Sequence, residues 1–346
     1  MKVAIITDTH YGARKNSKLF HDYFLRFYND IFFPTIDKEG INTILHLGDA
    51  FDNRTAVNFA ALSWSKDNIF DPIKDRGINV HLIVGNHDSY YKNTNDVNAV
   101  DLLLREYDNV SVYSEVTEVL IDKLKILFIP WINSENEENA FKLIQSTDCK
   151  VSMGHLELAG FAANKQVFME HGYDRKLFEK FEKVFSGHYH TRSTDGKITY
   201  LGNPYEIYWN DVEDPRGFHI FDTDTLKLTP IDNPYRLFYR LYYNDESASL
   251  LDARPYKDKI VKLIVRNKPR PKEFEKVVDK LYSAGVADLK VIENFVIQEA
   301  EDFEAYETED TLSILNRYIE DSEVDLDKNK IKIIMEQVYK EACEMI

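Results

Sequence analysis

Five short polar clusters in the sequence contain the residue types that bind metal ions or transfer protons. Each follows an apolar run, and they are Asp8-Thr9-His10, Gly48-Asp49, Gly85-Asn86-His87-Asp88, Gly154-His155 and Gly187-His188-Tyr189-His190. One such cluster alone is more often a turn than a site, because Gly, Asn and Asp are common turn residues. Five of them in this order indicate a shared site. Carboxylate, amide oxygen and neutral imidazole suit manganese, iron, zinc or magnesium rather than a thiolate centre.

A set of seven ligands can hold two metal ions when one carboxylate bridges them. Two ions about 3.5 to 4 Å apart stabilise both oxygens of an in-line phosphoryl displacement. A water bound between them also becomes a usable nucleophile near neutral pH. The residue types therefore predict phosphoryl chemistry.

The segments that carry these clusters alternate between strand and helix patterns at the start of the chain. Strands are expected at 3–6, 42–47 and 79–84, with helices at 18–38 and 56–70. This alternation predicts an α/β layered fold, whose ligands bind at the carboxyl ends of the strands. Later strands predict a second sheet, at 110–113, 125–130, 150–153, 183–186, 198–202 and 217–222. A small β-α-β unit is expected over 259–295.

With its five clusters in this order, the chain resembles the calcineurin-like metallophosphoesterase superfamily. Within it, the chain resembles the SbcD-type DNA repair nucleases, most of all the nuclease subunit of phage recombination endonucleases. The segments VGNHDSYYKN, GHLELAGF (154–161) and DPRGFHIFDTDT (214–225) carry this closer likeness. The resemblance implies a four-layer α-β-β-α sandwich of two mixed sheets, with a small α/β capping domain and a C-terminal helical tail.

The resemblance also implies a role for each residue of the clusters. Two divalent ions, manganese first and magnesium as the alternative, would be bound by Asp8, His10 and His190 on one side, by Asn86, His155 and His188 on the other, and by Asp49 between them. His87 would be the catalytic side chain, which stabilises the developing charge and donates a proton to the leaving oxygen. Asp88, grouped with the catalytic residues, would support this loop.

One position departs from the pattern of some family members. They carry a second catalytic histidine three residues after the bridging aspartate, where this chain has Asp52 in GDAFDNR. Bacterial and phage-like members often have aspartate there. We therefore expect activity, and Asp52 is retained as a catalytic candidate.

Charge is distributed unevenly along the 346 residues, whose net charge is −16. Residues 254–290 hold 11 Lys/Arg against 5 Asp/Glu, whereas residues 291–346 hold 5 against 16. With the resemblance, this predicts a nuclease domain at 1–240, a DNA-capping domain at 241–298, and an acidic linker with a helical tail at 299–346. DNA contacts are expected from Arg54, Arg266, Lys268, Arg270 and Lys272, which would bind the backbone independently of sequence.

The tail has apolar residues at helical spacing, and they need a surface to cover them. In the family this segment docks on the coiled-coil base of an SbcC-type ABC ATPase, so the resemblance implies such a partner and a homodimer within a heterotetramer. The expected contact residues are Leu312, Leu315, Ile319, Ile331, Ile334, Met335 and Val338.

Composition excludes some other classes of protein. Apolar residues make up 44% of the chain, yet no apolar run approaches the roughly 18 residues of a membrane span, and the N-terminus lacks a signal-peptide pattern. We therefore expect a cytoplasmic protein, in the host cytoplasm if phage-encoded, with reduced structural thiols at Cys149 and Cys343. Two other functions remain open: a small-molecule phosphodiesterase or phosphatase, and a metal-binding scaffold for the ATPase.

Overall fold

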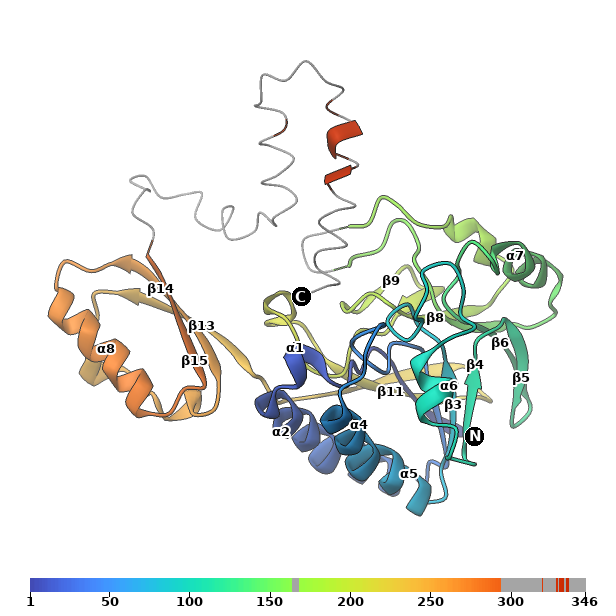
Figure 1. Ribbon diagram of the computed structural model, residues 1–346, viewed down its shortest axis with the longest axis horizontal. Helices are drawn as coiled ribbons and strands as arrows, with labels where there is room; N and C mark the ends of the chain where they lie inside the picture. The colour runs from blue at the N-terminus through green and yellow to red at the C-terminus, as the bar shows by residue number, and fades with distance from the viewer. Residues whose placement is uncertain (164–167, 294–318, 320–327, 329, 333, 336–346) are drawn as a thin grey trace.

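The computed structural model describes residues 1–163, 168–293, 319, 328, 330–332 and 334–335. Its first sheet has six strands in the order β12-β11-β1-β2-β3-β4 (Figure 1). Four strands run parallel, namely β1 (Lys2–Ile6), β2 (Thr43–His46), β3 (Asn79–Ile83) and β4 (Val110–Tyr113). β11 (Gly217–Asp222) pairs antiparallel with β1, and β12 (Lys227–Asp232) forms the edge.

The second sheet also has six strands, in the order β5-β6-β7-β8-β10-β9. Their bounds are β5 (Thr117–Ile121), β6 (Leu124–Ile129), β7 (Val151–His155), β8 (Lys183–Gly187), β9 (Ser193–Thr194) and β10 (Ile198–Tyr200). The assignment of residues 110–113 and 217–222 to this sheet was wrong, because they form β4 and β11 of the first sheet. Apolar patterning identifies a strand but carries no information about its hydrogen-bonded neighbour.

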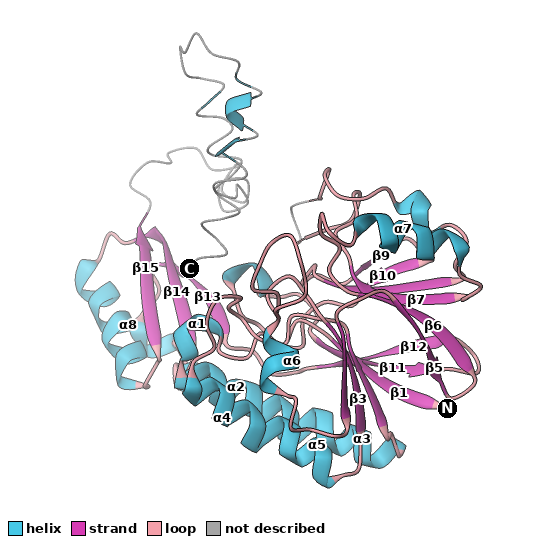
Figure 2. Ribbon diagram, turned by 45° about the vertical axis from the view of Figure 1, so that its right-hand side comes forward, coloured by secondary structure: helices cyan, strands magenta, loops and turns pink. Residues whose placement is uncertain are grey.

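The two sheets pack face to face, and helices cover the outer face of each (Figure 2). Side chains alternate along β1, so Val3 and Ile5 pack between the sheets while Ala4 and Ile6 pack under helices. The helical layer on the first sheet comprises α2 (Lys18–Phe27), α3 (Phe33–Glu39), α4 (Phe59–Ser65) and α5 (Asp71–Asp75), with the π-helical turns Tyr28–Phe32 and Lys66–Phe70 between them. On the second sheet lie α7 (Glu137–Ser146) and the 3-10 turn Arg175–Phe178. The predicted four-layer sandwich of two mixed sheets is confirmed.

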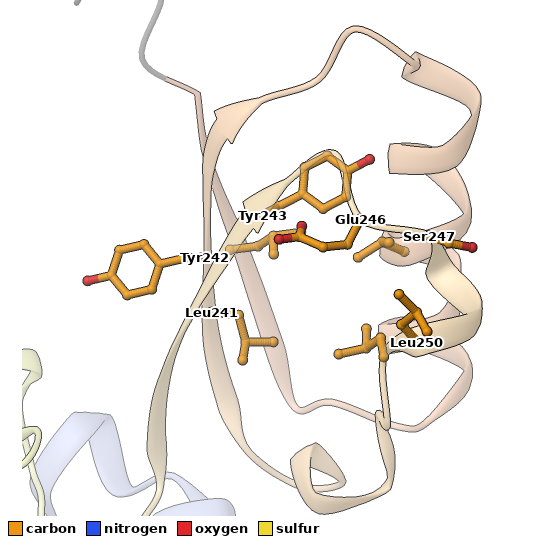
Figure 3. Close-up of a pocket in the computed structure, with 9 residues that line it drawn as sticks. Leu241, Tyr242, Tyr243, Glu246, Ser247 and Leu250 are labelled. Atoms are coloured by element: carbon orange, nitrogen blue, oxygen red, sulfur yellow. The ribbon is translucent and has the colours of Figure 1, made fainter. Parts of the chain in front are cut away.

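A third sheet is formed by β13 (Phe238–Asn244), β14 (Ile260–Asn267) and β15 (Asp288–Glu293), all parallel. α8 (Pro271–Ser283) connects β14 to β15, as expected for a β-α-β unit. β13 was not predicted, and the proposed boundary at residue 240 falls inside it. Along β13, Leu241 and Tyr243 face a cavity of about 170 Å³ on the helix side, whereas Tyr242 points the opposite way (Figure 3).

Little of the predicted partner-binding tail falls within the described residues. Leu312, Leu315 and Val338 lie outside them. Ile319 is buried, Ile331 and Met335 are half-buried, and Ile334 is 59% exposed. Within the described part of the chain, no helix has the length and apolar character needed to cross a membrane.

Candidate metal centre

The structure brings the five polar clusters together at one edge of the two sheets. Asp8 and His10 follow β1, Asp49 follows β2, and the 85–88 loop follows β3. His155 ends β7, and the 187–190 segment follows β8 in the second sheet. Since the carboxyl ends of parallel strands meet at the same edge, two sheets stacked in this way deliver donors from both sides.

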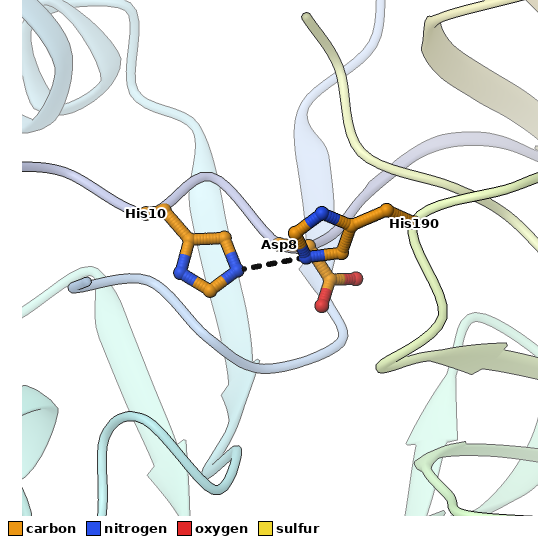
Figure 4. Close-up of side chains that lie close together, drawn as sticks. All are labelled: Asp8, His10 and His190. Atoms are coloured by element: carbon orange, nitrogen blue, oxygen red, sulfur yellow. Dashed lines mark hydrogen bonds between the residues drawn. The ribbon is translucent and has the colours of Figure 1, made fainter. Parts of the chain in front are cut away.

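One group of donors consists of Asp8, His10 and His190, whose ligand atoms lie within 4.8 Å of one another (Figure 4). The Nε2 atoms of His10 and His190 are 3.1 Å apart. Burial is the main reason that the pKa of His10 lies well below its ordinary value, and His87 and His190 add to the effect. His10 is therefore neutral, which is the form that binds metal ions.

A second group surrounds the side-chain oxygen of Asn86. This atom is 2.9 Å from His155 Nε2 and 3.1 Å from His188 Nδ1. Asp49 lies between the two groups, because its Oδ2 is 3.2 Å from His155 Nε2 and 3.9 Å from His10 Nε2. Burial alone would lower the pKa of His155, but Asp49 outweighs it and raises this pKa to about 9. A cation that binds His155 must therefore displace a proton.

The backbone is strained at four of the seven candidate ligands. The φ angles are 52° at Asp8, 44° at His10, 55° at Asp49 and 84° at His188. Residues other than glycine rarely adopt positive φ, and each instance costs about 1–3 kcal/mol. Such strain persists where the surrounding structure imposes it, and it is common at functional sites. The backbone strain and the converging oxygen and imidazole ligands together fit a site for divalent cations.

Two glycines of the clusters are required by close approach. A Cβ on Gly85 would lie 2.2 Å from Asp49 Oδ1, and a Cβ on Gly187 would lie 2.1 Å from Thr7 Oγ1 and 2.9 Å from Asp8 Oδ2. Any side chain at these positions would therefore displace a candidate ligand. This gives a physical reason for the glycine that precedes the ligand in these two clusters.

Asp88 connects the loops that carry the ligands. Its carboxylate is completely buried and accepts hydrogen bonds from four backbone amides, those of Asp49, Ala50, Phe51 and Gly85, at 2.8–3.1 Å. We therefore assign Asp88 a positioning role. It holds the loop after β2 against the loop after β3, and its oxygens do not reach a substrate.

His87 is half-buried, and its ring lies edge-on to His10 with centroids 4.9 Å apart. Its Nδ1–H donates to the carbonyl of Asp52 at 2.7 Å, so Nε2 is the free nitrogen. Its amide donates to Asp49 Oδ1 at 2.8 Å. Burial opposes protonation, but Asp49 and the Asp52 carbonyl outweigh it, and the pKa of His87 is raised.

Asp52 contributes to the centre in two ways. Its carbonyl fixes the orientation of His87, and its Oδ1 lies 3.5 Å from Nδ1 of His10. Neither of these last two atoms has a hydrogen-bond partner among the described residues. A carboxylate next to the outer nitrogen of a histidine ligand is a common way to orient the ring. Burial raises the pKa of Asp52.

The candidate DNA-binding residues have different environments. Arg54 donates to the carbonyl of Asn86 at 2.9 Å, so it supports a ligand loop. Lys268 and Arg270 form ion pairs with Glu293 and Asp245, whereas Lys272 is exposed. Arg266 stacks on Tyr242 on the face of the third sheet away from α8, with its guanidinium 4.4 Å from the ring centroid.

Two further cations on this sheet were not predicted. Lys262 Nζ lies 4.1 Å from the ring of Trp209, and Arg240 donates to the Trp209 carbonyl at 3.5 Å. Trp209 begins a 3-10 turn (Trp209–Asp211) directly after Tyr208, whose ring is near-parallel to that of His190. The alternation of IVKLIVRN places Lys262 and Arg266 on one face and could have identified this surface.

Arg216 is a buried residue of the site that sequence reasoning did not single out. Its guanidinium donates to the carbonyl of His190 and the side chain of Asn203. It also pairs with Asp211 at 3.1 Å and Asp214 at 2.8 Å. These contacts hold His190 in place from behind, and no local sequence pattern announces them.

Replacing Arg216 with alanine should lower the free energy of unfolding by about 3–5 kcal/mol, because it leaves two buried carboxylates without their partner. Chemical denaturation measures this change. The matched control is Arg105→Ala, which removes an exposed pair with Asp101 and should cost no more than about 1 kcal/mol. Equal effects of the two substitutions would contradict the role given to Arg216.

Comparison with known proteins identifies the class. Residues 1–192 match the family model described as calcineurin-like phosphoesterase. The chain therefore belongs to the calcineurin-like phosphoesterase family, as the resemblance implied.

A curated relative extends the likeness beyond that domain. The chain is 32% identical over 314 residues to "Exonuclease subunit 1" of Enterobacteria phage T4, covering 89% of each protein. Among solved structures, an archaeal phosphodiesterase aligns with a TM-score of 0.35 at 14% identity, over 67% of this chain and all of that one. The Pseudomonas putida nuclease MPE aligns with a TM-score of 0.31 at 15% identity, over 65% of this chain and 86% of that one.

Proposed function

We propose that this protein is a metal-dependent DNA nuclease, the nuclease subunit of a complex for double-strand-break repair and recombination. The observation that carries the proposal is the convergence of six oxygen and imidazole ligands around a seventh, Asp49, with the half-buried His87 beside them. Family membership supports phosphoester hydrolysis. The name of the phage T4 relative supports an exonuclease that works as one subunit of several.

The donor set divides into two candidate sites. Asp8, His10 and His190 would hold one divalent ion, Asn86, His155 and His188 the other, and Asp49 would contact both. Manganese is the proposed ion, with magnesium as the alternative. When bound, such ions polarise a phosphoryl oxygen and lower the pKa of a bound water.

The chain's own residues bind and orient the phosphodiester and move a proton. His87 is placed to contact the phosphate, because its Nε2 is free while Nδ1–H is held by the Asp52 carbonyl. A protonated His87 stabilises the negative charge that develops on the phosphate and donates its proton to the leaving oxygen. Asp88 fixes the position of His87 relative to Asp49, because its carboxylate accepts hydrogen bonds from the backbone of both loops.

The third sheet offers a surface for the DNA strand. Its face away from α8 carries Arg240, Lys262 and Arg266, and two of these contact Trp209 next to the centre. We propose that this face guides DNA by contacts to the backbone, which would be sequence-independent and salt-sensitive. Arg266 and Lys272 remain as candidates from the sequence, whereas the ion pairs of Lys268 and Arg270 favour structural roles.

The partner proposal rests on the tail and on the word "subunit" in the relative's name. We propose an SbcC-type ABC ATPase with coiled coils, bound through the helical tail, and a homodimer of this chain within a heterotetramer.

Cleavage of end-labelled duplex and single-stranded DNA with manganese tests the proposed substrate, measured beside a nucleotide monoester and a cyclic diester. Degradation of labelled DNA that stops with a chelator is the expected result. Turnover of the monoester or cyclic diester without DNA cleavage, even with the ATPase present, would favour a small-molecule phosphodiesterase. Normal ATPase binding without any metal-dependent cleavage would favour the scaffold.

A further inference from the structure

A short left-handed turn follows the first metal-binding cluster. Gly12 has φ 93°, and Arg14, Lys15 and Asn16 have φ angles of 55°, 60° and 60°. The turn is closed by a hydrogen bond from the Asn16 amide to the Gly12 carbonyl at 2.9 Å. Glycine adopts these angles freely, but three successive residues with side chains do not. Strain of this kind persists where the surrounding structure imposes it, and it is common at functional sites.

The side chain presented at this turn is Arg14. Its guanidinium carbon lies 5.2 Å from the centroid of the Tyr208 ring. That ring is near-parallel to the ring of His190, at 23° with centroids 6.1 Å apart. Arg14 and the candidate ligand His190 therefore lie against the same aromatic side chain. The turn belongs to α1 (Ala13–Asn16), which lies next to α2 on the side of the main domain that faces the third sheet (Figure 1).

Arg14 is half-buried, yet it forms no hydrogen bond or ion pair with any residue that the structure describes. Arg26 is a tyrosine-stacked arginine that differs in this respect. Arg26, which lies 3.8 Å from the Tyr235 centroid, also pairs with Asp30. A guanidinium has five N–H donors in a planar fork that matches the oxygens of a phosphate. None of these donors of Arg14 is used by a residue in the described part of the chain.

The location decides which phosphate Arg14 can hold. Its charge reaches Asp52, where it favours the ionised carboxylate. It nevertheless makes no ion pair with Asp8, Asp49 or Asp52, so it lies beyond direct contact with the acidic groups of the centre. A phosphate bound by Arg14 is therefore beside the position of cleavage.

We infer that Arg14, steadied by the ring of Tyr208, binds the backbone phosphate next to the scissile phosphate and so favours polynucleotides over isolated diesters. This inference rests on the proposed nuclease function. Arg14 would set the substrate's register through charge and geometry, without reading base sequence.

The test compares a single-stranded oligonucleotide with thymidine 5′-(p-nitrophenyl phosphate), a diester that has no neighbouring phosphate. Arg14→Ala should lower kcat/KM for the oligonucleotide by about 10- to 100-fold more than for the small diester, mainly through KM. Arg14→Lys should recover part of this loss, because it keeps the charge but not the fork. The matched control, Arg26→Ala, should leave the ratio of the two kcat/KM values unchanged.

The salt dependence of DNA binding distinguishes a phosphate contact by Arg14 from a purely structural role, which would leave it unchanged. Loss of one phosphate contact should reduce the slope of log affinity for single-stranded DNA against log salt by about 0.7. Equal losses on both substrates with an unchanged slope would overturn the inference. Wild-type protein that hydrolyses the small diester but cuts no oligonucleotide would instead refute the nuclease proposal, and that result is distinct from any effect of Arg14.

Discussion

Replacing His87 with alanine should lower kcat for DNA cleavage by about 10²–10⁴-fold, the usual contribution of a general acid or base. Metal binding should persist, because no candidate ligand is removed. His87 owes its position to the Asp52 carbonyl and the Asp49 side chain, and neither depends on the imidazole for its own place. Single-turnover cleavage at saturating manganese measures the loss, and calorimetric titration measures metal binding in the same variant.

His81 provides the matched control for this experiment. It lies on β3, the strand that leads to the same loop, and its ring nitrogen bonds to the hydroxyl of Tyr113 at 2.7 Å. His81→Ala removes an identical side chain without touching the centre, so the cleavage rate should stay near that of the wild type. If the His87→Ala protein cleaved DNA as fast as the His81→Ala protein, His87 would have no catalytic role.

Replacing Asp49 with asparagine should lower manganese affinity by at least about 100-fold. Substituting a residue that only supports a metal ligand lowers metal affinity by about 10- to 100-fold. Asp49 should have a larger effect, because it lies between both groups of ligands. Asparagine keeps the acceptor for the His87 amide, so the loop should hold its shape. DNA cleavage at micromolar manganese should be lost and should partly return as manganese is raised.

Melting temperature without metal separates this effect from misfolding. The metal-free Asp49→Asn protein should still melt cooperatively, at a lower temperature than the wild type, because the buried pair of Asp49 with His155 is lost. Asp52→Asn serves as a comparison, since the Asp52 carboxylate lies 3.5 Å from the outer ring nitrogen of one candidate ligand, His10. Its loss of affinity should be smaller. A larger loss at Asp52 would contradict the central place of Asp49.

The strand-end clusters could be predicted because each lies within a few residues of the strand that positions it. The turns after β1, β2 and β3 can be recognised from a buried apolar strand followed by polar turn residues, and both are local features of the sequence. The third sheet was anticipated in part, since β14, α8 and β15 form a continuous unit. Its first strand, β13, has the mixed sequence FYRLYYN, which lacks a clean alternation.

The features that escaped prediction depend on contacts between distant parts of the chain. Arg216 reaches His190 and Asn203 across a turn, and β11 pairs with β1 at the other end of the domain. The placement of Arg14 against the ring of Tyr208 depends on backbone angles that no residue type in ARKNS demands. Packing also decides which cations of the basic segment are already paired, as it does for Lys268 and Arg270.

A crystal structure of the wild-type protein soaked in manganese, with anomalous difference density, would show whether the two groups of ligands each hold an ion. We expect two peaks, one among Asp8, His10 and His190 and one among Asn86, His155 and His188, with Asp49 in contact with both. A single peak away from Asp49, or no peak at manganese concentrations that support DNA cleavage, would contradict this expectation.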